Sequence, residues 1–216
     1  MNHFSQFSTG PDHGHQHLPE PGPAEPGQWP KLEAALAVVN RDLTATLPDQ
    51  EALILMVDPP WPSPSPSPSP SPSPSPSPGG IDRGQVYVAM PDGRWHGNAV
   101  NPGDLEEGDP PEPDDATTVL TAVADAAQST IMELRWQVWP ICSEHKIGMH
   151  PRPAGTTDDW YPGETDADGG PPVWWCRGGR GTDCHDVSPV GELAATLPGR
   201  QRRALRRSER GRGGRR

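Results

Sequence analysis

Apolar residues recur at helical spacing in a first stretch of the chain. Four of them lie three or four positions apart: Leu32, Leu36, Val39 and Leu43. This spacing places side chains on one face of an α-helix. Pro30 fits the first turn of such a helix, and the Leu47-Pro48 pair marks its end. The pattern therefore predicts an amphipathic helix that begins near Pro30.

A second helical pattern leads directly to the first cysteine. Its apolar positions again fall on one face: Leu120, Val123, Ala127, Ile131, Leu134 and Val138. Asp114 or Asp115 provides the N-terminal cap, and Pro140 stops the helix just before Cys142. The sequence predicts a helix over residues 115–138 that delivers the chain to a segment rich in cysteine and histidine.

Between the two helical stretches, short apolar runs indicate β-strands. Residues 52–57 are continuously apolar, and residues 85–90 form a second strand-like run. The turn signal Pro91-Asp92-Gly93 follows, so we expect residues 94–100 to return as the partner strand of a hairpin. Together these elements predict an α+β fold, with two helices on a small antiparallel sheet followed by a zinc-ribbon-like Cys/His knuckle.

Proline and glycine change this picture, because 31 prolines and 24 glycines among 216 residues exceed what a fully packed chain contains. We expect residues 1–28 to be disordered. Eight Ser-Pro dipeptides follow the first strand, and alternating proline favours an extended spacer of about 50 Å. Because strands flank it on both sides, this spacer (61–80) is predicted to be a loop inside one domain (29–138). The Cys/His knuckle segment then occupies residues 139–199.

The net charge of −11 is distributed unevenly along the chain. Residues 200–216 contain nine arginines and one glutamate, whereas the other 199 residues carry 9 basic and 28 acidic side chains. We expect this Arg-rich tail to be disordered. It would bind nucleic acid weakly and without sequence specificity, through the arginines at its start: Arg200, Arg202, Arg203, Arg206 and Arg207. The tail lacks an aromatic residue for base stacking, so a nucleic-acid accessory protein is an alternative and not the favoured function.

No stretch of the sequence suits a membrane span or a secretory signal. The longest aliphatic run, residues 52–57, has six residues, and residues 1–10 contain neither a basic region nor an apolar run. We therefore expect a cytoplasmic protein without a membrane partner. In a reducing compartment, clustered cysteines favour a metal ion over a disulfide.

All three cysteines lie in the Cys/His knuckle segment. Two residues separate Cys142 from His145, which is the spacing of a tight turn that presents both side chains to one ion. The second half of the site is less regular, because seven residues separate the next two cysteines. The preferred ligands of a Zn²⁺ ion are Cys142, His145, Cys176 and Cys184. His185 in place of Cys184 is the main alternative, and His150 is held in reserve.

Other interpretations of these residues stay open from the sequence alone. Cys176 and Cys184 could form a disulfide, the cysteines could be core residues beside tryptophans, and the histidines could be surface groups. Four protein ligands would close the coordination shell, which favours a structural ion. A zinc-dependent hydrolase would instead need an open site at Cys142, His145 and Cys176, with Glu144 as the adjacent acid or base. The motifs HExxH, GxSxG and Walker A are absent.

The favoured interpretation is a non-enzymatic interaction or adaptor module that Zn²⁺ stabilises and that binds a protein partner. The segment WPxCxxH at Trp139–His145, with His150-Pro151 and Val173–Cys176, resembles a group of uncharacterised small actinobacterial proteins. Two further stretches carry the same resemblance: Tyr87–Trp95 and Val119–Asp125. The resemblance implies a cytoplasmic protein outside the membrane, and it assigns neither an activity nor a functional residue.

Overall fold

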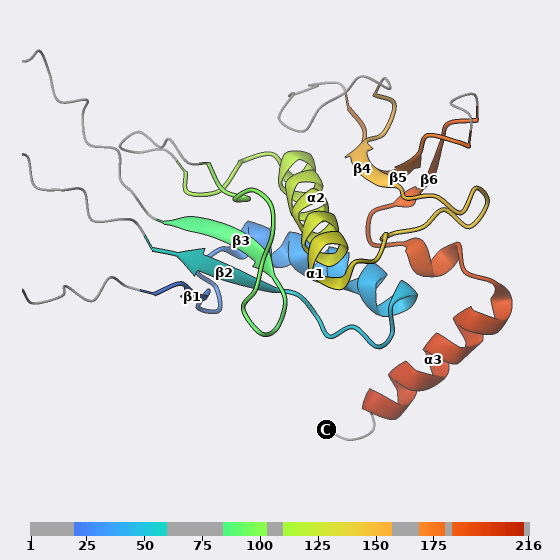
Figure 1. Cartoon of the computed structure of the whole chain (residues 1–216), viewed down its shortest axis with the longest axis horizontal. Coiled ribbons are helices and arrows are strands. Elements are labelled where there is room, and N and C mark those ends of the chain that lie inside the picture. Colours follow the sequence, from blue (N-terminus) through green and yellow to red (C-terminus); the bar gives the residue numbers. More distant parts are fainter. Residues whose placement is uncertain (1–19, 60–83, 103–109, 157–168, 180–182, 214–216) are drawn as a thin grey trace, which may run out of the picture.

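The computed structural model describes residues 20–59, 84–102, 110–156, 169–179 and 183–213. Two three-stranded antiparallel sheets flank a central pair of helices (Figure 1). The elements are, in chain order, β1 (Gly22–Pro23), α1 (Pro30–Thr46), β2 (Ile54–Asp58), β3 (Gln85–Ala89), α2 (Ala116–Arg135), β4 (His150–Pro153), β5 (Pro172–Cys176), β6 (His185–Pro189), the short 3₁₀ helix η1 (Leu193–Ala195) and α3 (Gly199–Gly213). The predicted α+β class is confirmed. The sequence predicted one sheet and two helices, so the second sheet and the helix α3 were missed.

The helix α1 forms where the apolar spacing predicts it. Its buried face carries the expected side chains: Leu32, Leu36, Val39 and Leu43. At its N-terminus, Glu33 accepts hydrogen bonds from the backbone N–H groups of Gly27 and Trp29, and Glu112 accepts one from Leu32 at 2.8 Å. These carboxylates satisfy N–H groups that the first turn of a helix leaves without partners.

The helix α2 begins at its predicted cap but ends earlier than predicted. The Asp115 carboxylate accepts a hydrogen bond from the Thr118 N–H at 2.6 Å. The helix stops at Trp136, which adopts a left-handed conformation with φ 52°. Val138 therefore lies beyond the helix and is 46% exposed, so its predicted place on the buried face is wrong.

The first sheet pairs β3 with β2, and the residues after the turn follow the other edge of β3 without forming a strand. Met56 lies opposite Tyr87 in the antiparallel ladder of β2 and β3. After the turn, residues 94–100 meet β3 through an isolated bridge between Ala89 and Trp95 and through a hydrogen bond from the Val100 N–H to the Val86 carbonyl at 2.8 Å, so the predicted hairpin returns along β3 but lacks its second strand. The Asn101 side chain extends this contact, because its Oδ1 accepts a hydrogen bond from the Val86 N–H.

The predicted disorder of residues 1–28 is corrected at its C-terminal end. Gly22 and Pro23 form β1, which pairs with Val57 and Met56 of β2. Residues 1–19 and the Ser-Pro loop at 61–80 lie outside the described residues.

The second sheet brings the Cys/His knuckle segment against the helices. β5 lies in its centre, with β4 and β6 on its two sides. The strand β4 has the sequence His-Pro-Arg-Pro, and prolines are tolerated there because β4 is an edge strand. Trp174 of β5 is fully buried and packs edge-on against Trp139 at 5.3 Å between ring centroids.

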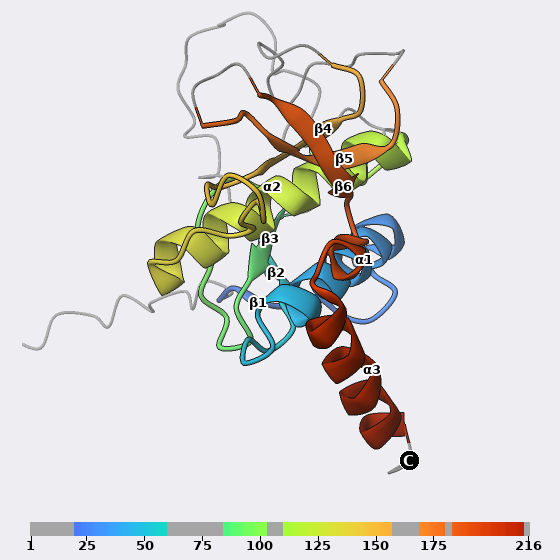
Figure 2. The same ribbon diagram turned by 90° about the vertical axis from the view of Figure 1, so that its right-hand side faces the viewer.

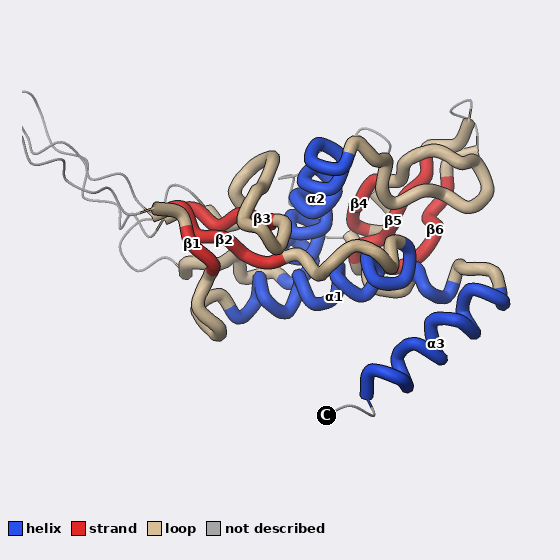
Figure 3. Tube along the Cα trace, turned by 60° about the horizontal axis from the view of Figure 1, so that its bottom comes forward, coloured by secondary structure: helices blue, strands red, loops and turns tan. Residues whose placement is uncertain are grey.

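The two central helices join the sheets into one core. Figure 3 shows α1 and α2 between the two sheets, and the buried side chains of both helices and both sheets form one continuous cluster. Gln128 of α2 donates hydrogen bonds to the carbonyl oxygens of Trp139 and Met149. This buried amide fixes the two ends of the segment that carries Cys142.

A buried carboxylate on α1 holds the chain that follows the second sheet. Asp42 is 0% exposed and accepts hydrogen bonds from the Trp174 indole, from the Gly191 N–H and from the Leu193 N–H at 2.6–2.7 Å. Gly191 has φ +95°, and a Cβ there would lie 2.5 Å from Val38. Glycine is therefore required where this turn approaches α1.

The Arg-rich tail is helical where the sequence predicted disorder. Residues 199–213 form α3, which extends away from both sheets (Figure 2). Arginine has a high intrinsic helix propensity, and most residues of α3 before Gly211 suit a helix. Among the described residues, no helix combines the length and apolarity that crossing a membrane requires.

Candidate metal centre

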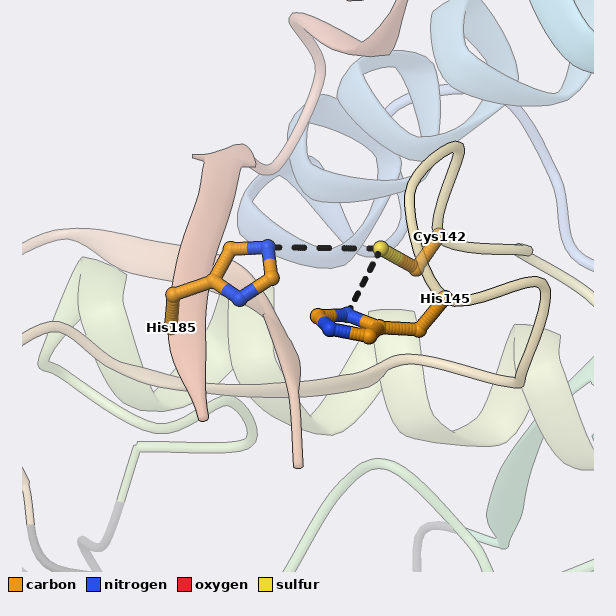
Figure 4. A group of neighbouring side chains, drawn as sticks. All are labelled: Cys142, His145 and His185. Carbon is orange, nitrogen blue, oxygen red and sulfur yellow. Dashed lines mark hydrogen bonds between the residues drawn. The ribbon is translucent and has the colours of Figure 1, made fainter. Parts of the chain in front are cut away.

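The first half of the site is a tight turn between Cys142 and Lys146. The Cys142 N–H donates to the Ile147 carbonyl at 2.9 Å, and the Lys146 N–H donates to the Cys142 carbonyl at 3.0 Å. Lys146 adopts φ 59°, and Ile141 bridges to Gly148 across the turn. This backbone points the side chains of Cys142 and His145 toward the same space (Figure 4).

The second half of the site is a cross-strand pair. Cys176 at the end of β5 lies directly opposite His185 at the start of β6. Residues directly opposite in an antiparallel ladder carry neighbouring side chains on one face. The register of β5 and β6 therefore presents one thiol and one imidazole together, although nine positions separate them in the sequence.

The side chains of both halves converge on one point. The Cys142 sulfur lies 3.8 Å from His145 Nδ1 and 4.0 Å from His185 Nε2 (Figure 4). The Cys176 sulfur lies 3.5 Å from His145 Nδ1. The ligand atoms of Cys142, His145 and His185 all lie within 4.8 Å of one another, which is a group able to hold a metal ion.

The sulfur–nitrogen separations are close to those of a tetrahedral site, and Cys176 lies beside this group but outside the three residues whose ligand atoms are all within 4.8 Å of one another. Zinc–sulfur bonds of about 2.3 Å and zinc–nitrogen bonds of ~2.0–2.1 Å place a sulfur and a nitrogen ligand ~3.6 Å apart at a tetrahedral angle. The three sulfur–nitrogen distances here are 3.5, 3.8 and 4.0 Å. Shifts of a few tenths of an ångström would bring these three distances to the value expected around zinc, whereas Cys176 would have to move further toward the rest of the group to act as a fourth ligand.

A backbone carbonyl orients the His185 ring. Its Nδ1 lies 2.9 Å from the Asp183 carbonyl oxygen, which accepts the Nδ1 hydrogen. In the neutral ring, Nε2 then carries the lone pair and faces the Cys142 sulfur. The hydrogen bond to Asp183 also raises the pKa of His185. Histidine ligands of metals usually donate their second N–H in this way, so the arrangement suits a metal ligand.

Backbone N–H groups stabilise the negative charge that a metal-binding thiolate carries. Burial is the largest single influence on Cys142 and opposes its ionisation, but the N–H groups of His145 and Glu144, together with the His145 ring and the Cys176 thiol, outweigh burial and lower the pKa to about 7. Burial raises the pKa of Cys176, partly offset by the Gly178 N–H. Cys142 is therefore the thiol that ionises first.

The structure places the sequence-predicted residues unequally. Cys142, His145 and Cys176 lie together, and His185 occupies the position next to Cys142. Cys184 is exposed and is not in the converging group, and His150 is exposed on β4. The reason is local geometry, because successive residues entering a strand point to opposite faces. Sequence spacing alone contains no signal that selects His185 over its neighbour.

Glu144, which lies in the tight turn, brings a carboxylate to the His185 ring. Its Oε2 lies 3.9 Å from His185 Nε2, and its side chain is largely exposed.

Comparisons with protein-family models, with curated proteins and with solved structures gave no significant match to this chain. The interpretation of the site therefore rests on its own geometry.

Proposed function

We propose that Cys142, His145, Cys176 and His185 hold a Zn²⁺ ion, and that the protein is a non-enzymatic interaction module that this ion stabilises. The observation that supports the proposal is the convergence of thiol and imidazole groups from a tight turn and from a cross-strand pair. Sulfur and imidazole donors in a tetrahedral arrangement are the ligand set that zinc prefers in proteins.

The proposed centre is structural. Four protein ligands fill a tetrahedral shell and leave no position for a substrate or an activated water. Cys142 is 1% exposed, and the buried residues Trp139, Met149 and Trp174 lie in the same core cluster. The ligand set combines one knuckle with one cross-strand pair, which differs from the two knuckles of a zinc ribbon.

The ion would connect the tight turn at Cys142 to the ends of β5 and β6 that face it. The turn at Cys142 follows α2, whereas Cys176 and His185 belong to the second sheet. Structural zinc contributes its binding free energy to folding, of the order of 10 kcal/mol in small zinc domains. Holding the turn against β5 and β6 would therefore stabilise the whole Cys/His knuckle segment.

Measuring the zinc content of the purified full-length chain by mass spectrometry tests the proposal. We expect one zinc ion per chain in the wild-type protein. Cys184→Ser is the matched control, because it changes the exposed cysteine next to His185 and should leave the zinc content unchanged. His185→Ala should lose most of the ion.

Two results would reject this assignment. Wild-type protein that folds with its native near-ultraviolet tryptophan spectrum but contains no metal would eliminate the centre. Loss of zinc in Cys184→Ser with retention in His185→Ala would show that the ligand set preferred from the sequence is right and that the set proposed from the geometry is wrong.

A further inference from the structure

Three exposed apolar side chains lie on the segment that leads from α2 into the metal centre. Trp136 is 90% exposed, Ile141 is 50% exposed and Val138 is 46% exposed. Single exposed apolar residues are ordinary on a protein surface, but clusters of them mark contact sites. The sequence positions of these residues place them within six residues of one another.

A groove next to this segment is lined mainly by apolar side chains. It has a volume of about 580 Å³ and lies between the C-terminal end of α1, the segment 137–141 and α3. Its apolar lining includes Leu47, Val138, Ile141, Leu197, Ala204 and Leu205. No charged residue lines this groove among the described residues.

Arginines lie next to this groove. A second groove of about 740 Å³ shares Ala45 and Leu205 with it, and the charged residues that line this second groove are Arg41 and Arg202. α3 also carries Arg200, Arg203 and Arg207, which are exposed. Neither groove has an aspartate or a glutamate in its described lining.

We propose that the apolar groove and the arginines of α3 bind an acidic amphipathic helix of a partner protein. The inference rests on the proposed function as an interaction module and names its surface and its class of partner. An amphipathic helix fills such a groove with apolar side chains spaced at i, i+3, i+4 and i+7. Carboxylates on its flanks would pair with Arg202 and with the exposed arginines of α3.

A nucleic-acid strand fits this surface less well. Phosphate groups would pair with the arginines, but the lining of the groove itself offers bases no stacking face, because its aromatic residue, Trp139, is 2% exposed and the exposed Trp136 lies outside that lining. A phosphate backbone would leave the leucine, valine and isoleucine side chains uncovered. Aliphatic lining together with a basic edge is complementary to an apolar face flanked by carboxylates.

The metal centre holds one wall of this groove. Ile141 lines the groove, immediately precedes Cys142 and bridges to Gly148 across the tight turn. An ion bound at Cys142 would therefore fix the position of Ile141. This connection gives the proposed zinc a role in binding as well as in stability.

The test uses the full-length chain with its metal content measured on every sample. The probe is a fluorescent helical peptide of about 16 residues with leucines at the i, i+3, i+4 and i+7 positions and glutamates elsewhere. Three comparison probes are a scrambled peptide of the same composition, a peptide with lysine in place of glutamate, and a single-stranded oligonucleotide. Binding is followed by fluorescence anisotropy, and the oligomeric state by sedimentation.

Two variants and one control locate the binding surface. Ile141→Glu places a carboxylate in the apolar groove and should weaken binding of the acidic peptide about tenfold or more. Arg202→Glu should weaken it as well, because Arg202 lines the neighbouring groove, and should reduce its salt dependence. Ala34→Glu is the matched control, because Ala34 is exposed on α1 and lines neither groove.

The proposal is supported if the acidic peptide binds more tightly than the three comparison probes and Ile141→Glu weakens that binding without loss of metal. It is overturned if the acidic peptide does not bind at about 100 μM, a concentration that detects weak interfaces. Preferred binding of the oligonucleotide overturns it too, as does self-association that Ile141→Glu abolishes. Peptide binding by protein that contains no metal would reject the zinc centre and leave the surface supported.

Discussion

Replacing Asp42 with asparagine tests how α1 holds the second sheet. The Asp42 side chain is fully buried, and its carboxylate accepts three hydrogen bonds. Its Oδ2 accepts from the Trp174 indole and the Gly191 N–H, and its Oδ1 accepts from the Leu193 N–H. Asparagine keeps the shape of the side chain but offers one oxygen, so its amide group must face at least one of these donors.

The size of the effect follows from two opposing contributions. Losing one hydrogen bond to a charged acceptor, and leaving its donor without a partner, costs about 2–3 kcal/mol. Burial raises the pKa of Asp42, which means that the charge itself is costly in the folded protein, and removing it returns part of that cost. We expect Asp42→Asn to lower the free energy of unfolding by about 2 kcal/mol.

Urea unfolding of the full-length chain at neutral pH, followed by circular dichroism, measures this difference. Asp49→Asn is the control, because Asp49 is exposed in the loop after α1 and should change stability by less than about 0.5 kcal/mol. An Asp42→Asn variant as stable as the wild type would show that relief from charge burial outweighs the three hydrogen bonds. That result would refute the role assigned to Asp42.

Three further predictions concern α2 and the metal. Hydrogen bonds from the Thr118 backbone and side chain lower the pKa of Asp115 below its ordinary value of 3.8, so this stabilisation is present above pH 3.8 and is lost as the pH falls through the lowered value. Asp115→Ala should therefore destabilise the protein by about 1 kcal/mol at pH 7 in urea unfolding, and by much less near pH 2. Gln128→Leu leaves the carbonyl oxygens of Trp139 and Met149 without their hydrogen-bond donor. We expect the free energy of unfolding to fall by about 2 kcal/mol, and the variant to lose zinc more readily to a competing chelator. Removing the metal with a chelator should increase hydrogen exchange in β5 and β6 and leave β2 and β3 protected, whereas equal loss of protection in both sheets would contradict a local role for the ion.

The helices α1 and α2 were the most predictable part of the fold, because each has a long apolar face and a clear start signal. Even so, the end of α2 could not be placed, since the left-handed conformation of Trp136 has no marker in the sequence. α3 was missed because its arginines resemble a solvated tail, although arginine is also a good helix former.

The strands were less predictable because their pairing depends on distant residues. β4 contains two prolines in four residues and is a strand only as the edge of a sheet that β5 completes. The hairpin expected after β3 lacks a regular second strand, because residues 94–100 meet β3 only at Trp95 and Val100.

Only the first half of the candidate site, the tight turn, could be predicted from the sequence. Cys142 and His145 lie in one turn, so their spacing alone indicates that they act together. The pairing of Cys176 with His185 depends on the register of β5 and β6, which no local spacing encodes. A cross-strand ligand pair can be recognised from sequence only when both strands are already assigned.

X-ray absorption at the zinc edge of the purified wild-type protein tests the proposed centre most directly, because it reports the atoms bound to the ion. We expect two sulfur ligands at about 2.3 Å and two nitrogen ligands at about 2.0–2.1 Å, with the imidazole scattering of two histidines. A shell with three sulfurs would identify Cys184 as a ligand in place of His185. A shell that contains a water oxygen would contradict a closed structural centre.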